Sequence, residues 1–247
     1  MAKFWILKNI FKIHPLTYLV LISILLCGYF NYFLIIALIL IVHDLGHLIM
    51  FKIYGYQILS IMILPFGSMI NTNLNANAKT SELFLISLAG VSCQLLLYPI
   101  MALILNPLNY QIFLEYNQIL IVFNLLPIIP LDGAKLMMAL LEICFSYKTA
   151  LKLLNLVSII TLIILLYYLA FNALNTYLII GFLAYQTYQA IVKHQYLFNQ
   201  FLLTRYLKKH SYRQLKYIDN IKQIFKNKYN FIKGKSEDKV LAAYFND

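Results

Sequence analysis

Charged residues are scarce in this sequence, and acidic ones especially so. Of its 247 residues only 12% are charged and nine are Asp or Glu, whereas 62% are hydrophobic. A soluble domain has about 45–50% apolar residues, and a soluble chain as apolar as this one would expose large apolar patches. The composition therefore excludes an ordinary soluble domain and predicts a protein with several membrane spans.

Cysteine is also scarce. Cys27, Cys93 and Cys144 all lie in apolar segments, and no two of them have CxxC spacing. This spacing excludes a paired-cysteine motif, so we expect the three residues to behave as small buried hydrophobic side chains.

The positive charge is abundant but unevenly distributed. The formal net charge is +11, and twelve of the twenty Lys and Arg residues lie beyond residue 192. This distribution predicts a basic cytoplasmic tail at 193–247, close to anionic lipid. No other feature favours nucleic-acid binding, so we expect no nucleic-acid partner.

The apolar residues gather in six candidate spans, which together predict a membrane domain at 16–192. They are Leu16–Phe30, Phe33–Tyr54, Glu82–Leu105, Gln111–Pro127, Leu151–Phe171 and Tyr177–Val192. The preceding residues 1–15 are basic, aromatic and amphipathic, as expected of a segment at the membrane interface. Lys and Arg occur in alternate connections, so the positive-inside rule places both termini in the cytoplasm. No small-residue cleavage site follows the first run, which therefore reads as a retained anchor.

Two segments interrupt this helical pattern. Residues 55–80 contain the β-branched run Ile58–Leu64 followed by Pro65-Phe66-Gly67, which predicts a strand and a turn of a hairpin dipping into the membrane. Since strand edges are not tolerated against lipid, the hairpin must face protein, a water-filled cavity or a peptide. Pro127 and Pro130 then break the fourth span. The predicted fold is an all-α polytopic membrane protein of about six helices with a membrane-embedded β-hairpin.

Ionisable residues inside a membrane are costly and usually functional. His43, Asp44 and His47 lie in the second candidate span, and Asp132 follows the broken fourth one. Two further acids have simpler interpretations. Glu115 is close to a span end, and we expect Glu142 to pair with a lysine such as Lys148 or Lys135.

His43 and His47 have the i, i+4 spacing with which two imidazoles on one helix face bind one Zn²⁺ ion. Asp132 is the candidate third ligand, which would leave a fourth position open for water, as in a catalytic zinc site. Asp44 is then the candidate general base for attack of that water on a peptide carbonyl. Two alternatives are a polar cluster that holds helices together and a metal transporter, for which acidic or His residues along several spans would be expected.

These residues resemble the site-2 proteases, zinc metalloproteases that cleave substrates within or near the membrane. The family has HExxH on one helix and an NxxPxxPxDG-like stretch on a later one; this chain has HDLGH at 43–47 and NLLPIIPLDG at 124–133. PFG at 65–67 and AG at 89–90 are similar to further family features. The resemblance covers residues 33 to about 140. It implies that His43, His47 and Asp132 bind zinc and that Asn124 orients the substrate or the intermediate.

The architecture is most similar to the family branch that includes a sporulation protease activating a sigma-factor precursor. That resemblance implies a multi-pass protein of a bacterial cell membrane, a membrane-associated protein substrate and regulatory membrane protein partners. No insertion is large enough for a PDZ domain, and residues 193–247 are too few for a complete CBS domain, which this branch often carries.

Asp44 is the departure from the family pattern, which has Glu at this position. The Asp carboxylate is shorter by one methylene, a retreat of about 1.5 Å. We therefore expect zinc binding to be kept and cleavage to be slowed. The alternative is a pseudoprotease that binds zinc and its substrate or partner without efficient cleavage.

Overall fold

The computed structural model describes residues 11–64, 67–169, 174–208, 212 and 214–246. These residues belong to two compact units. The first unit runs to Leu74 and also contains Leu85–Asn124, and the second contains Asn75–Phe84 and the chain from Leu125 onward. Each unit is described by itself below.

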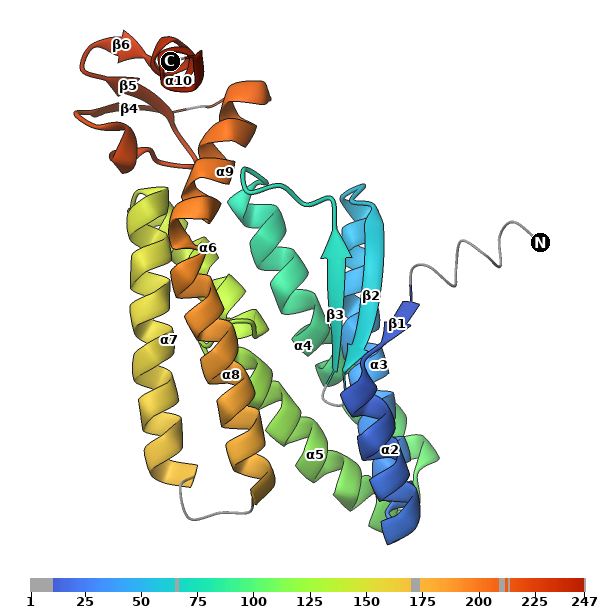
Figure 1. Cartoon of the computed structure of the whole chain (residues 1–247). Helices are drawn as coiled ribbons and strands as arrows, with labels where there is room; N and C mark the ends of the chain where they lie inside the picture. Colours follow the sequence, from blue (N-terminus) through green and yellow to red (C-terminus); the bar gives the residue numbers. More distant parts are fainter. Residues whose placement is uncertain (1–10, 65–66, 170–173, 209–211, 213, 247) are drawn as a thin grey trace. The chain divides into compact units, whose positions relative to one another are not determined.

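Among the described residues, helices and a small sheet make up the first unit (Figure 1). The helices are α2 (Pro15–Cys27), α3 (Phe30–Ile53), most of α4 (Thr80–Ile104) and α5 (Pro107–Leu125). Ile39 of α3 and Phe113 of α5 are fully buried, and further apolar residues of α3, α4 and α5 pack around them. These three helices therefore share one core.

The burial pattern of α3 determines what this helix presents to that core. Its buried residues Ile35, Ile39, His43 and His47 recur at every fourth position, which places them on one helix face. The remaining surface stays apolar, with Ile41 and other large hydrophobic residues exposed. A helix that is apolar all round and buried on one face only is typical of a helix packed in a membrane.

The predicted hairpin is present. Strand β2 (Ile58–Leu64) has the predicted bounds and pairs antiparallel with β3 (Gly67–Thr72), while residues 65 and 66 of the expected turn lie outside the described residues. A third strand, β1 (Phe11–Ile13), pairs parallel with β2, so β2 is central in the sheet. Residues 1–10 of the expected interfacial segment at 1–15 lie outside the described residues, and the interfacial location stays a prediction.

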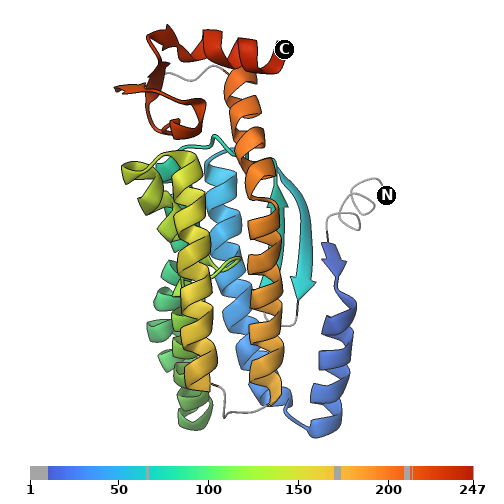
Figure 2. The ribbon, with the colours of Figure 1, turned by 60° about the vertical axis from the view of Figure 1, so that its left-hand side comes forward.

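Helices α6 to α10 and a second small sheet belong to the second unit. Its elements are α6 (Asp132–Cys144), α7 (Tyr147–Leu169), α8 (Leu174–Val192), α9 (His194–Leu207), β4 (Leu215–Ile218), η1 (Ile221–Gln223), β5 (Tyr229–Ile232), β6 (Lys235–Ser236) and α10 (Glu237–Asn246). Helices α7 and α8 lie side by side (Figure 2). The strand order is β4-β5-β6, with β4 parallel and β6 antiparallel to β5.

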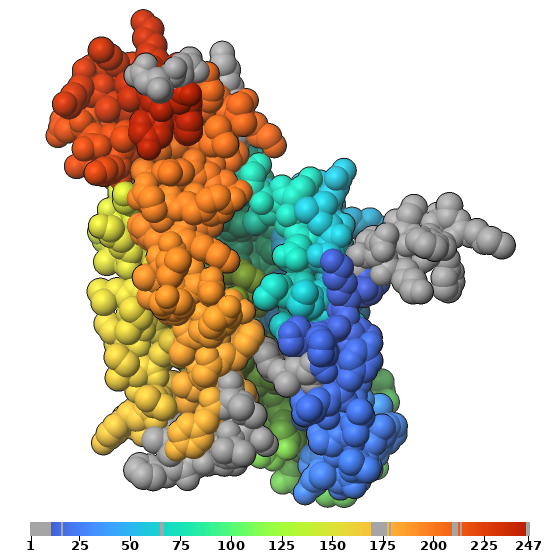
Figure 3. Space-filling view, in the orientation of Figure 1, coloured from blue at the N-terminus to red at the C-terminus, as the bar shows by residue number. Residues whose placement is uncertain are grey.

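The C-terminal segment is folded, which corrects the expectation of a basic tail. The red atoms of its last residues lie against the orange atoms of the residues before them (Figure 3). Phe201 and Leu202 of α9, Ile224 and Leu241 are almost completely buried in one apolar cluster, which Tyr147 at the start of α7 joins. Apolar residues are thus distributed through the basic sequence at positions that close a core.

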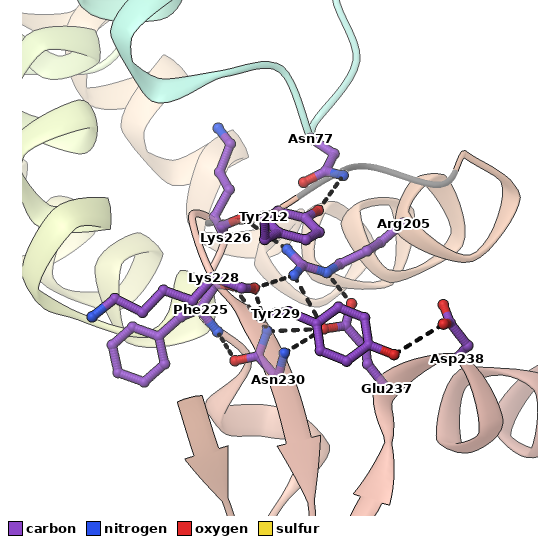
Figure 4. Close-up of polar contacts among 10 residues, drawn as sticks. All are labelled: Asn77, Arg205, Tyr212, Phe225, Lys226, Lys228, Tyr229, Asn230, Glu237 and Asp238. Carbon is purple, nitrogen blue, oxygen red and sulfur yellow. Dashed lines mark hydrogen bonds and ion pairs between the residues drawn. The ribbon is translucent and has the colours of Figure 1, made fainter. Parts of the chain in front are cut away.

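A buried ion pair joins α9 to α10 in this segment (Figure 4). The Arg205 guanidinium pairs with the Glu237 carboxylate and donates to the backbone carbonyls of Lys226 and Lys228. The ring of Tyr212 lies 4.4 Å from the guanidinium carbon. A buried charge needs such partners, because an unpaired one would carry its full desolvation cost.

A second buried ion pair joins the C-terminal segment to α6. Lys226 Nζ lies 2.9 Å from Glu142 Oε1, and Thr80 donates to the other oxygen of Glu142 at 2.7 Å. Burial lowers the pKa of the Lys226 ammonium, an effect that the nearby Glu142 carboxylate opposes. Glu142 thus pairs with a lysine as expected, but not with the suggested Lys148 or Lys135, which bond Gln195 and Asp132.

All six predicted spans overlap helices. Within the described residues, three helices are long and apolar enough to cross a membrane: Phe30–Ile53, Thr80–Ile104 and Tyr147–Tyr168. Helix α2 has only 13 residues, or about 20 Å of helix, against a hydrocarbon core of about 30 Å. The fold is thus mostly helical, while six spans and a membrane-embedded hairpin stay predictions. Cys27 and Cys144 are exposed rather than buried.

Candidate metal centre

Two histidines of α3 face each other inside the first unit. His43 and His47 are both buried, and their Nε2 atoms lie 3.1 Å apart. Nδ1 of His47 lies 2.8 Å from the backbone carbonyl of Ile86, and Nδ1 of His43 lies 3.0 Å from Oε1 of Gln94. Both rings are therefore held through Nδ1 by groups of α4, with their Nε2 atoms turned toward each other.

This arrangement determines which ring nitrogens can bind a metal. A carbonyl oxygen only accepts hydrogen bonds, so Nδ1 of each ring is the donor and Nε2 carries a lone pair in the neutral ring. Two nitrogens bound to one tetrahedral zinc ion at about 2.0–2.1 Å lie about 3.3 Å apart. The observed 3.1 Å between the Nε2 atoms fits that geometry.

Small residues let α4 approach the two rings. A Cβ added to Gly90 would lie 2.5 Å from Cε1 of His43 and 2.6 Å from Nε2 of His47. On α3, a Cβ added to Gly46 would lie 2.6 Å from the carbonyl oxygen of Ala89. Glycine at both positions is therefore a packing requirement, because any side chain would separate the helices or displace the rings.

Asp132 belongs to the second unit, at the first position of α6. It is buried, and its Oδ1 accepts a hydrogen bond from Lys135 Nζ at 2.8 Å. A carboxylate in the first turn also interacts favourably with the helix dipole. The chain folds tightly before it, since a Cβ on Gly133 would lie 2.1 Å from the carbonyl oxygen of Leu125.

The broken segment before Asp132 has its backbone carbonyls satisfied by neighbouring helices. Ser158 of α7 donates to the carbonyl of Pro127 at 3.0 Å, and Thr187 of α8 donates to that of Ile129 at 3.5 Å. Irregular backbone at membrane depth requires such partners. The break predicted from Pro127 and Pro130 is confirmed, because α5 ends at Leu125 and α6 begins at Asp132.

The two other predicted site residues have clear local positions. Asp44 is half-buried on α3, next to His43. Asn124 lies in the last turn of α5, where its amide nitrogen donates to the carbonyl of Leu120 at 3.0 Å. Their roles as base and substrate-orienting residue stay predictions.

Sequence reasoning missed Gln94, which contacts His43 directly. Its signal was available, because a glutamine in an apolar span needs a hydrogen-bonding partner there. Gln94 also lies four residues after Gly90, which places both on the same face of α4.

Comparison with known proteins relates the chain to one group of enzymes. No protein-family model matches it. It is 26% identical over 202 residues to stage IV sporulation protein FB of Bacillus subtilis (strain 168), covering 78% of this chain and 70% of that protein. Its structure resembles that of the site-2 protease from Methanocaldococcus jannaschii, with a TM-score of 0.57, 23% identity and coverage of 73% of this chain and 89% of the other.

The fold that this chain shares with the solved site-2 protease carries, in this chain, an HxxxH pair on a buried helix face. More specifically, the sequence relationship and the shared fold together relate the chain to the site-2 protease family. The resemblance seen in the motifs at 43–47 and 124–133 is thereby confirmed.

Proposed function

We propose that this protein is a zinc-dependent intramembrane endopeptidase in which His43, His47 and Asp132 bind the metal ion. One observation carries the proposal. The Nε2 atoms of the two histidines lie 3.1 Å apart, while both Nδ1 atoms lie against carbonyl oxygens. Two ring nitrogens at this distance suit a site in which both bind one zinc ion.

The donor set is that of a catalytic zinc site. All three side chains are buried, and each offers one ligand atom. Two histidines and one carboxylate are the ligand types of hydrolytic zinc centres, which keep a further position open. When bound, the ion polarises the substrate carbonyl and makes a bound water acidic.

Protein groups would supply the rest of the chemistry. Asp44, adjacent to His43, takes the proton of the attacking water and passes it to the leaving amine. Lys135 Nζ donates to Oδ1 of Asp132 at 2.8 Å, and Asp132 would be the third ligand of the ion. Asn124 is the candidate donor to the substrate carbonyl, in exchange for its present bond to Leu120.

The β-hairpin is the proposed docking surface for an extended substrate segment. The His14 amide donates to the carbonyl of Ile63, so Ile63 and alternate residues of β2 face β1. By the alternation of an antiparallel ladder, Met62 then bonds Met69, and the backbone groups of Ser68 and Ile70 point away from β2. This outer edge of β3 could accept an added strand, as in β-strand addition.

The biological setting is proposed from the family and its sporulation relative. The protein would be a multi-pass protein of a bacterial cell membrane, with both termini cytoplasmic. Its substrate would be a membrane-associated protein, and a sigma-factor precursor is the specific candidate. Regulatory membrane proteins are the proposed additional partners. The sporulation protein's name supports this setting, since the chain covers 70% of that protein.

The test is a joint measurement of zinc content and cleavage. The purified protein is reconstituted in liposomes with single-span model substrates, and products are read by mass spectrometry with and without a zinc chelator. We expect one zinc per chain and chelator-sensitive cleavage. A protein without bound zinc after equilibration with the metal would refute the proposed site, and chelator-resistant cleavage would refute the proposed mechanism.

Asp44 favours one second candidate, a pseudoprotease that holds zinc and substrate without efficient cleavage. The variant Asp44→Glu distinguishes the two. If the wild type binds zinc and substrate but cleaves nothing while Asp44→Glu cleaves, the protein is a pseudoprotease with an intact framework. Cleavage by the wild type at a measurable rate excludes this candidate.

A further inference from the structure

A line of buried polar side chains runs from the two histidines across the first unit. Gln94 of α4 and Asn117 of α5 are both 0% exposed. Gln94 Oε1 contacts Nδ1 of His43 at 3.0 Å, and Asn117 Nδ2 donates to the backbone carbonyl of Gln94 at 3.2 Å. Three helices of this unit thus contribute one polar residue each to a continuous chain of contacts.

These contacts do not satisfy all the hydrogen-bonding groups of Gln94 and Asn117. Nε2 of Gln94 and Oδ1 of Asn117 have no hydrogen-bond partner among the described residues. Leaving a buried polar group unsatisfied costs about 1–3 kcal/mol. A leucine at position 94 would avoid that cost for the Gln94 amide but would remove the acceptor of His43 Nδ1, so the contact with His43 is what favours glutamine there.

The two ends of the glutamine amide would have opposite effects on His43. With Oε1 against the ring, Nδ1 of His43 is the donor and Nε2 keeps its lone pair. With the amide rotated by 180°, its NH₂ group would donate to Nδ1, and the proton of the neutral ring would move to Nε2. The orientation of Gln94 therefore determines whether His43 offers Nε2 to a metal ion.

Asn117 holds the backbone at Gln94 close to a position where α4 lacks one of its own hydrogen bonds. Pro99 lies inside this helix and removes the N–H that would bond the carbonyl of Leu95. The Asn117 amide donates to the adjacent carbonyl, that of Gln94. It ties α4 to α5 where the helix lacks one of its own hydrogen bonds.

We propose that Gln94 is a positioning residue for the metal centre, held by Asn117, which keeps the Nε2 lone pair of His43 directed at the ion. The inference rests on the proposed function, because it assigns Gln94 a role toward the ion that His43 would bind. Second-sphere partners of this kind alter metal affinity by about 10–100-fold when they are replaced. Gln94 would thus act through His43 and not on the substrate.

The test compares three variants of the full-length protein. Gln94→Leu removes the contact with His43, and Gln94→Glu keeps an accepting oxygen. Ser92→Ala is the control, because Ser92 is exposed on the same helix and its hydroxyl donates to the carbonyl of Leu88 in its own helix turn. Zinc affinity is measured by competition with a chelator. Thermal unfolding of the metal-free protein and kcat and KM of the loaded protein are measured alongside it.

We expect Gln94→Leu to bind zinc about 10–100-fold more weakly, which is more than any fall in the unfolding temperature of the metal-free protein accounts for. Gln94→Glu should keep zinc affinity within a few-fold of the wild type, and Ser92→Ala should match it. A merely structural role would instead lower the unfolding temperature in Gln94→Leu and leave zinc affinity unchanged, which would overturn the inference. If the wild type itself binds no zinc, the proposed function fails as well, so the two failures are distinguishable.

Discussion

Replacement of Gly90 by alanine is the most direct test of the arrangement of the two histidines. Its added Cβ would lie 2.5 Å from Cε1 of His43, 2.6 Å from Nε2 of His47 and 2.7 Å from Nδ1 of His43. Ordinary van der Waals contact begins at 3.4 Å, so these three distances would each be too short by about 0.8 Å. The obstacles are stiff rings whose Nδ1 atoms are held by α4, and they cannot yield as the end of a flexible chain would.

The expected cost has a structural and a functional part. Overpacking by one methyl group costs about 1–3 kcal/mol. Displacing a reacting or ligating group by about 1 Å can lower the rate on the order of 10²-fold. We therefore expect Gly90→Ala to lose most of its zinc and cleavage activity while retaining its helical content.

Gly181→Ala is the matched control. Gly181 also lies inside a helix, α8, but a Cβ added there would meet nothing within 4 Å. Alanine is favoured over glycine in a helix interior by about 1 kcal/mol, so this variant should keep its zinc and unfold at the same or a higher temperature. Zinc content, circular dichroism and cleavage in liposomes are compared for both variants. Full zinc occupancy and normal cleavage in Gly90→Ala would refute the described approach of α4 to the histidines.

Three further predictions follow from other parts of the molecule. Asp44→Glu should raise the cleavage rate by up to about 10²-fold at unchanged zinc content, because it restores about 1.5 Å of reach; an equal or lower kcat would contradict this geometry. Ile70→Pro should lower substrate cleavage without loss of zinc, because it removes an outward N–H of β3, whereas Ile70→Ala keeps that N–H and should be less affected; equal cleavage by the two variants would argue against strand addition. Lys226→Met should destabilise the second unit by about 3–5 kcal/mol because it leaves Glu142 buried without its cation. The double variant Glu142→Gln/Lys226→Met should recover most of that loss in thermal unfolding, and a single variant as stable as the wild type would show that the ion pair contributes little.

The sequence alone determined the features that depend on short-range spacing. The i, i+4 separation of His43 and His47 places both on one face of any helix that contains them, whatever surrounds it. The β-branched run Ile58–Leu64 predicted a strand with the observed bounds, and Pro127 and Pro130 predicted the end of α5, because proline removes a donor from the helix. The family resemblance followed from the same local motifs.

Only the tertiary structure decided which distant residues meet. The partner of Glu142 is Lys226, 84 positions away, and not a lysine nearby in the sequence. The segment expected as a basic tail at 193–247 is folded, because its apolar residues are buried in a shared core. These residues are too sparse in the sequence to show a helical or strand period. Gln94 is the clearest case: its contact with His43 depends on the close approach of two helices at Gly90. Such contacts depend on how side chains from separate elements fit together in space, which local spacing does not specify.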